Sequence, residues 1–316
     1  MGVVQSATPT DLPTLLPAAI TGPHDLAAAL GEVDYLAGEG LATVAYLSLR
    51  LNRPLFLEGE PGVGKTALAQ AMAVLLDAPL IRLQCYEGID SSQALYDWDF
   101  PRQLLHLRAA ETAAGHGDGP DIEVLEGELY DERFLLQRPL LQALRTSPSV
   151  LLIDEIDRAD DEFEAFLLEL LSEFAVTIPE LGEIRAEVPP LVVITSNRTR
   201  EVHDALKRRC TYHWLDHPDF ERECAIIRRR CPRAGEDLTR QVVAAVQALR
   251  AEDLFKPPGV AETIDWTNAL VALGADTLDA DLATHTLGSV LKYREDLEQA
   301  QRLDLGRLVA QALAGS

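Results

Sequence analysis

The sequence predicts an α/β fold in which a parallel five-stranded sheet is flanked by helices and is followed by a C-terminal helical domain. Three observations predict it. Short apolar runs, typical of strands buried on both faces, recur through residues 54–215 and alternate with helical patterns. A glycine-rich phosphate-binding loop follows the first of these runs. After Pro218 only helical patterns remain, at residues 220–230, 237–251, 261–273 and 281–313.

The first strand is expected at residues 54–58, and helical patterns at residues 25–49 lead into it. It is followed by a loop at residues 59–66 that matches G-x-x-x-x-G-K-[ST]. Its glycines permit positive φ and let successive amides curl around a phosphate, while Lys65 supplies charge near the β- and γ-phosphates and Thr66 is expected to hold Mg²⁺. The residues expected to bind nucleotide are Glu60, Pro61, Gly62, Val63, Gly64, Lys65, Thr66 and Ala67. A chance glycine-rich turn is the competing interpretation, and the strand before and helix after it argue against chance.

After a second strand at residues 80–84, a third apolar run at residues 150–153 ends in Asp154 and Glu155. Because the carboxyl ends of parallel strands form the ligand crevice of an open sheet, Asp154 is expected beside the phosphate loop as a Mg²⁺ ligand. An acid directly after it can deprotonate a water in line with the γ-phosphorus. Glu155 is therefore the expected catalytic base, and hydrolysis is the expected reaction. A strand ending in a solvated charge cluster is the competing interpretation.

A fourth strand at residues 191–195 ends next to Asn197, whose amide is suited to positioning the attacking water. Arg208 and Arg209 precede a last strand at residues 211–215, where an arginine could reach the γ-phosphate bound to a neighbouring subunit. Such arginine fingers raise hydrolysis by ~10³–10⁵. A solvated basic cluster at a helix end is the competing interpretation.

These motifs, in this order, resemble those of the AAA+ ATPases: residues 59–66 as Walker A, residues 151–155 as Walker B, Asn197 as sensor 1, and Arg208 or Arg209 as the finger. The resemblance covers nearly the whole chain. Further segments resemble the MoxR family, specifically its branch associated with the maturation of molybdenum-containing carbon monoxide dehydrogenases. These segments are residues 53–59, 86–90, 132–140, 261–266 and 287–296.

The resemblance implies ATP and Mg²⁺ as cofactors and a homo-oligomeric ring, expected to be a hexamer. It further implies a chaperone-like motor that acts in maturation, or metal-cofactor insertion, of a client metalloenzyme, with a partner that contains a von Willebrand A domain. The expected organisation is an N-terminal arm at residues 1–24, an AAA+ domain at 25–218 and a helical lid at 219–316. The AAA+ domain would contain a helix-2 insert at about 91–131 and a pre-sensor-1 hairpin at about 175–189.

One position departs from the AAA+ pattern. Many of these proteins carry an arginine, sensor 2, early in the third lid helix, where this chain has Glu262. Lys292 and Arg294 are the nearest basic candidates in the lid. Two alternatives to a motor therefore stay open: a nucleotide-switched assembly scaffold and, less favoured, a nucleic-acid-handling AAA+ ATPase.

The acidic composition of the chain indicates which kind of macromolecule it binds. The 316 residues contain 51 acids against 28 lysines and arginines, a formal net charge of −23. Nucleic-acid binders gain affinity by neutralising phosphates, so a protein is the expected partner and DNA or RNA is not. No apolar run approaches the ~20 residues that span a bilayer. The cysteines, Cys85, Cys210, Cys224 and Cys231, are irregularly spaced, which is typical of reduced thiols in a cytoplasmic protein.

Overall fold

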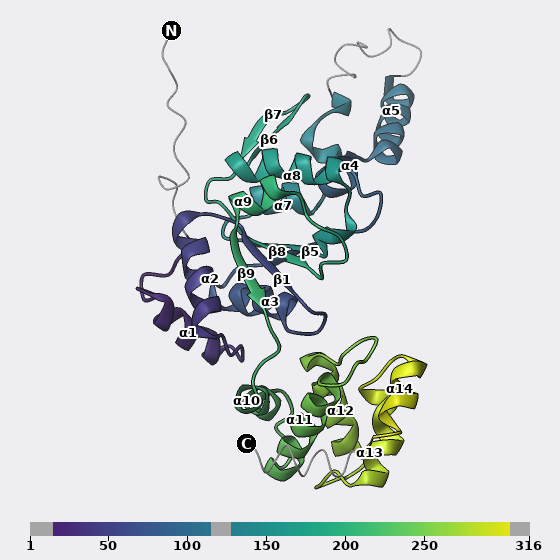
Figure 1. The fold of residues 1–316 in the computed structure, drawn as a ribbon. Coiled ribbons are helices and arrows are strands. Elements are labelled where there is room, and N and C mark those ends of the chain that lie inside the picture. The colour runs from purple at the N-terminus through teal and green to yellow at the C-terminus, as the bar shows by residue number, and fades with distance from the viewer. Residues whose placement is uncertain (1–14, 115–127, 304–316) are drawn as a thin grey trace.

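The computed structural model describes residues 15–114 and 128–303. Its centre is a five-stranded sheet in the order β2-β5-β8-β1-β9, with every neighbouring pair parallel (Figure 1). The strands are β1 (Leu55–Gly59), β2 (Leu80–Gln84), β5 (Val150–Asp154), β8 (Leu191–Ser196) and β9 (Thr211–Leu215). The predicted fold class is confirmed. Because β8 lies between β1 and β5, the loops that follow these three strands meet at one edge of the sheet.

Burial on both faces explains why the three central strands, β1, β5 and β8, are largely apolar. Every residue of β1 is buried, and Phe56 belongs to one hydrophobic cluster while Leu55 and Leu57 belong to another. The Phe56 cluster includes residues of α7 (Pro139–Arg145), α8 (Asp161–Glu173) and α9 (Asp204–Arg209). The opposite cluster includes residues of α1 (Pro23–Glu32), α2 (Glu39–Leu51) and α3 (Lys65–Leu75). Helices thus cover both faces of the sheet, which fixes its carboxyl edge as the accessible place for a ligand.

The helical pattern over residues 25–49 belongs to two helices rather than one. α1 ends at Glu32, Asp34 adopts a positive φ of 61°, and Gly38 precedes α2 with extended backbone. A left-handed residue cannot continue a right-handed helix, so the chain turns and packs α2 against α1 (Figure 1). The resulting loop at residues 33–38 reaches the phosphate-loop side of the molecule, which sequence periodicity alone does not reveal.

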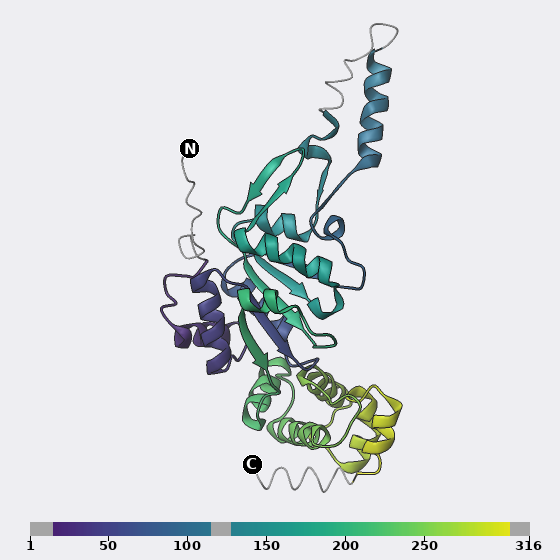
Figure 2. The same cartoon turned by 45° about the horizontal axis from the view of Figure 1, so that its top comes forward.

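The segment between β2 and β5 contains α4 (Ser91–Ala94), β3 (Tyr96–Trp98), α5 (Phe100–Ala114), η2 (Glu132–Phe134) and β4 (Leu135–Gln137), with β3 and β4 paired antiparallel. α5 projects away from the rest of the chain (Figure 2). Residues 115–127 of the expected insert lie outside the described residues. η3 (Ile156–Arg158) follows β5, and an antiparallel hairpin of β6 (Ala175–Ile178) and β7 (Gly182–Arg185) follows α8.

The C-terminal part is helical: α10 (Phe220–Arg230), α11 (Glu236–Arg250), α12 (Val260–Ala272), α13 (Ala280–Thr286), η4 (Leu287–Ser289) and α14 (Arg294–Ala300). These helices enclose their own apolar core around the fully buried Trp266. Within the described ranges, no helix has the length and apolarity that crossing a membrane requires.

The single long helix expected over residues 281–313 is wrong for its described part. The chain leaves α13 through η4 and is extended at Tyr293 before α14. Lys292 Nζ donates to the carbonyls of Gly288 and Ser289. These hydrogen bonds satisfy backbone acceptors that have no partner within the helix at its C-terminal end. Asp296, at the start of α14, accepts from the backbone N–H groups of Phe255 and Lys256. These contacts stabilise the interruption between α13 and α14. The helical periodicity of the sequence does not reveal them.

Candidate active site

The phosphate loop joins β1 to α3, and two glycines give it its shape. Gly59 approaches β9 so closely that a Cβ there would lie 2.3 Å from the Leu215 carbonyl oxygen, and Gly64 starts α3 with φ 102°. Lys65 Nζ donates to the carbonyls of Gly59 at 2.7 Å and Glu60 at 2.8 Å. An ammonium group has three donors, so one remains to face a phosphate. The loop therefore presents backbone amides and a lysine to an anion.

Burial dominates the electrostatics of Lys65. The residue is 6% exposed, and desolvation holds the pKa of its ammonium group below the usual value. The carboxylates of Asp157, Asp154, Glu60 and Glu155 act in the opposite direction, since negative charge favours the protonated form. The site thus holds one ammonium group among four carboxylates, and Mg²⁺ bound there would offset the negative charge that a polyphosphate anion would otherwise meet.

Asp154 ends β5 and lies against the phosphate loop, as the sequence predicts. Its Oδ1 accepts from Thr195 Oγ1 at 2.5 Å and lies 3.3 Å from Thr66 Oγ1, and its Oδ2 pairs with Arg82 at 2.6 Å. Hard oxygen donors on neighbouring elements suit Mg²⁺, so Thr66 and Asp154 fit the metal assigned to them from the sequence. When bound there, Mg²⁺ would neutralise charge on phosphate oxygens.

Glu155 and Asn197 are brought together at the same edge. Glu155 has a positive φ of 57° and its Oε1 accepts from Asn197 Nδ2 at 3.2 Å. Its Oε2 accepts from Gln84 Nε2 at 3.0 Å and pairs with Arg158 Nε at 3.0 Å. The carboxylate that the sequence assigns as base is therefore held by donors from three segments.

Gln84 and Arg158 were missed by sequence reasoning. Gln84 ends β2 in register with Asp154, so the signal for it was a polar residue at the carboxyl end of the strand neighbouring β5. Arg158 lies three residues after Glu155 in a 3₁₀ turn, a spacing that brings the two side chains to one side. Neither signal is specific by itself.

Asp157 is a third acid of this cluster and is 3% exposed. It accepts from the backbone N–H of Asn197 and from both the N–H and the hydroxyl of Thr199. Burial by itself raises the pKa of the Asp157 carboxyl, but these hydrogen bonds outweigh burial and hold the pKa below its usual value. Asp157 thereby fixes the backbone that carries Asn197.

Arg208 and Arg209 lie at the end of α9 and are exposed. Arg208 pairs with Asp204 on its own helix at 2.7 Å, and Arg209 donates to the Leu168 carbonyl of α8 at 3.4 Å. Lys207 differs from both because its ammonium pairs with the buried Glu58 at 3.0 Å. The basic cluster therefore divides into one structural lysine and two arginines held only by surface contacts.

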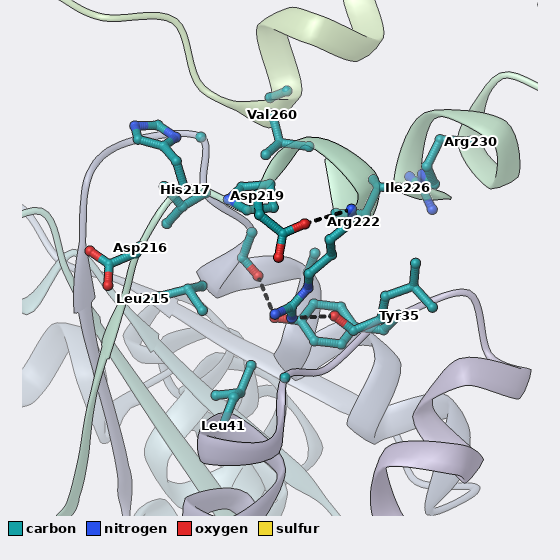
Figure 3. A pocket seen from close by; sticks show the side chains of 18 of the residues that line it. Tyr35, Leu41, Leu215, Asp216, His217, Asp219, Arg222, Ile226, Arg230 and Val260 are labelled. Atoms are coloured by element: carbon teal, nitrogen blue, oxygen red, sulfur yellow. Dashed lines mark hydrogen bonds between the residues drawn. The ribbon is translucent and has the colours of Figure 1, made fainter. Parts of the chain in front are cut away.

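A cavity of about 620 Å³ adjoins the phosphate loop. Residues 62–64 and Ala67 of the phosphate loop and α3 form part of its wall, and three further segments complete it: the loop between α1 and α2 with the start of α2, the end of β9 with α10, and the start of α12 (Figure 3). Arg222 donates to the Leu36 carbonyl at 2.6 Å, and the hydroxyl of Tyr35 lies 3.5 Å from the Gly64 carbonyl oxygen. Sequence reasoning found the phosphate-loop side of this cavity but missed the rest, since no motif marks the other segments that line it. Its place and size suit a nucleoside attached to phosphates in the loop.

The lid presents Glu262 to this region. Glu262 Oε2 accepts from the backbone N–H of Gly259 at 2.9 Å, which caps α12. Lys292 is held by carbonyls of the lid itself, and Arg294 pairs with Glu298 at 2.8 Å on α14. Both basic candidates from the sequence are therefore engaged within the lid, and the lid residue that faces Gly62 of the phosphate loop is the acidic Glu262.

A phosphate loop, an acidic strand end and an adjoining nucleoside-sized cavity on a parallel sheet define a P-loop nucleotide hydrolase. Residues 54–210 match the family model described as AAA domain (dynein-related subfamily). The chain has the AAA+ P-loop fold. The protein is accordingly an ATP hydrolase that uses ATP with Mg²⁺.

The curated relatives and the solved structures are distant. An uncharacterized protein of Staphylococcus aureus strain USA300 is 25% identical over 206 residues, covering 63% of this chain and 69% of its own length. One from Staphylococcus epidermidis is 24% identical over 241 residues, covering 74% and 80%. A mutant of RuvB from Thermotoga maritima has a TM-score of 0.45 at 17% identity, covering 88% of this chain and 73% of its own. The Thermotoga maritima RuvB Holliday junction branch migration motor has a TM-score of 0.43 at 16% identity, covering 85% and 72%.

Proposed function

We propose that this ATPase is a MoxR-type remodelling motor that acts in the maturation of a partner metalloenzyme or in the insertion of its metal cofactor. The observation that carries the proposal is α5, a helix that projects from the AAA domain within the segment between β2 and β5 (Figure 2). Phe100, Leu104 and Leu105 on it are 62%, 50% and 67% exposed. Exposed apolar side chains grouped on a projecting element mark protein contacts.

The net charge of −23 supports a protein client over a nucleic acid, since phosphate backbones are bound by excess positive charge. The MoxR resemblance contributes the class of client and a partner with a von Willebrand A domain. We place the motor in the cytoplasm as a homo-oligomeric ring, a hexamer, built from an arm at 1–24, the AAA+ domain at 25–218 and the lid at 219–316.

In the proposed reaction each residue has one task. Glu155 takes a proton from the attacking water, and Asn197 positions that water beside the γ-phosphate. Lys65 binds phosphate oxygens, while Thr66 and Asp154 hold Mg²⁺. Arg209, with Arg208 as the alternative, reaches the γ-phosphate of the neighbouring subunit. The hydrogen bond from Asn197 to Glu155 supports the first pair of roles.

Changes on α5 test the remodelling role. Phe100→Ser combined with Leu105→Ser should leave ATP turnover within about twofold of wild type, because α5 contributes no residue to the active site. Activation of the client should be lost. Leu136→Ser, also at an exposed leucine, is the matched control and should spare both activities. Unchanged client activation by the α5 variant would exclude remodelling through this helix.

Glu262 favours a second candidate, a nucleotide-switched scaffold in which hydrolysis only times assembly. An acid at the sensor position leaves the start of α12 without the arginine that would contact the γ-phosphate. A Glu155→Gln trap separates the candidates. With ATP it should retain a client protein if the chain is a motor. Recovery of no partner, together with stimulation of the wild-type ATPase by DNA, would contradict the chaperone proposal and favour nucleic-acid handling.

A further inference from the structure

The lid touches the phosphate loop through two facing glycines, Gly62 and Gly259. Gly259 precedes α12 with φ −84°, a conformation open to any residue. A Cβ on it would nevertheless lie 2.7 Å from the Pro61 carbonyl oxygen and 2.8 Å from Gly62 Cα. Backbone atoms cannot give way as the end of a flexible side chain can. Position 259 therefore excludes a side chain because two backbones meet there, and not because of backbone strain.

The phosphate-loop side of the contact is equally close. A Cβ on Gly62 would lie 2.8 Å from Glu262 Oε2 and 3.1 Å from Gly259 Cα. The backbone N–H of Ala261 donates to the Gly62 carbonyl at 3.3 Å, so one of the donors at the start of α12 is satisfied by the phosphate loop itself. Glu262 stabilises the first turn of α12 by accepting a hydrogen bond from the backbone N–H of Gly259.

The lid side of the contact is anchored in the lid core. Arg250 Nε donates to the Pro258 carbonyl at 2.6 Å, directly before Gly259. The same guanidinium pairs with Glu223 at 2.6 and 2.8 Å, and Thr263 donates to Glu223 at 2.7 Å. Glu223 is fully buried and the Arg250 side chain is 9% exposed. Residues 258–259 are thus fixed to α10, α11 and α12 and can move only with the lid.

We propose that Gly62 and Gly259 form a joint through which the lid senses whether the phosphate loop holds a nucleotide. Phosphate bound to the loop amides fixes the backbone around Gly62, and the start of α12 docks on that fixed backbone. The lid thereby responds to phosphate without an arginine on the phosphate itself. Because Gly62, Val260 and Ala261 also line the nucleoside cavity, docking closes that cavity and strengthens nucleotide binding. Gly259 is a positioning residue in this scheme.

Gly259→Ala tests the joint, with Gly235→Ala as the matched control in the same lid. Gly235 precedes α11 with φ −65°, and a Cβ there would meet nothing within 4 Å. Because an added Cβ overpacks the contact between the two backbones, Gly259→Ala should weaken binding of fluorescent ADP by about tenfold. Gly235→Ala should bind as wild type. Equal affinity of all three proteins for ADP would overturn the proposal.

Amide hydrogen exchange provides a measurement that a merely structural role of Gly259 would not affect. In the wild type, ADP should slow exchange at the Ala261 amide, and Lys65→Ala should abolish that response to ADP. In Gly259→Ala the response should be lost while Gly235→Ala keeps it. If ADP leaves exchange across residues 259–263 of the wild type unchanged, the joint does not sense nucleotide. This wild-type measurement holds even if Gly259→Ala fails to fold.

Discussion

Glu155 sits at positive φ with both carboxylate oxygens occupied by donors, so its orientation is set before any water is bound. A non-glycine residue in the left-handed region is uncommon, and at active sites such strain is sustained by surrounding contacts. The sequence predicted that Glu155 and Asn197 lie at the same edge of the sheet, because the ends of strands can be read from apolar runs. It could not identify Gln84 or Arg158, whose roles depend on the strand order and on a 3₁₀ turn.

Glu155→Gln should bind ATP with wild-type affinity and lose about 10²–10⁴-fold in turnover, since an amide cannot take a proton from water. Lys65→Ala should instead lose ATP binding. Glu162→Gln changes an exposed glutamate on α8 and is the matched control. Steady-state ATPase assays and fluorescent nucleotide titration measure both properties. Equal turnover by Glu155→Gln and wild type would remove Glu155 from the mechanism.

Asp157 gives a pH-dependent prediction. Its lowered folded-state pKa means that its stabilisation is present above the unfolded pKa, near ~3.9, and is lost as pH falls through the folded pKa. Thr199→Val removes one donor and should cost about 1–2 kcal/mol of unfolding free energy at pH 7. The difference from wild type should shrink below about pH 4.

Urea unfolding across the pH range measures this difference. Thr284→Val is the control, because the Thr284 hydroxyl donates to the Ala280 carbonyl and not to a titrating group. A Thr199→Val penalty that stays constant from neutral to acid pH would show that the Asp157 carboxylate does not depend on this hydroxyl.

At the scale of elements, apolar runs predicted β1, β5 and β8 because every residue of these strands is buried. β2 and β9 are only partly buried at the two ends of the sheet, and their predicted positions are also confirmed. Local periodicity was less reliable for helices. It merged α1 with α2 and extended one helix across the break at Tyr293, since both interruptions depend on tertiary contacts or a single left-handed residue. The nucleoside cavity was unpredictable for a related reason. Apart from the phosphate loop, it is lined by segments far apart in the chain that carry no motif.

The buried ion pair of Arg250 and Glu223 organises the lid helices. Arg250→Met should lower the unfolding free energy by about 3–5 kcal/mol, because it leaves Glu223 charged and fully buried. Arg228→Met breaks a pair whose partners are 40% and 54% exposed and should cost at most about 1 kcal/mol. Chemical denaturation followed by circular dichroism compares the two. Equal costs would show that burial of the pair does not decide its importance.

On the scale of the whole molecule, the site and the proposed finger lie on different parts of one subunit. Arg208 and Arg209 end α9 and pair with Asp204 of the same helix and the Leu168 carbonyl of α8, and no hydrogen bond or ion pair in the described ranges joins them to Glu155 or Lys65. A finger of this kind serves a neighbouring copy, which is the physical basis for the proposed ring. ATPase activity per subunit should therefore rise with protein concentration.

Mixing two inactive variants tests this shared site most directly. Lys65→Ala keeps Arg209 but binds no ATP, and Arg209→Ala binds ATP but lacks the finger. Each alone should be nearly inactive, and an equimolar mixture should recover up to about a quarter of the wild-type rate per subunit, the share of interfaces with both groups intact. Full activity of Arg209→Ala alone, or a mixture as inactive as its components, would contradict the account.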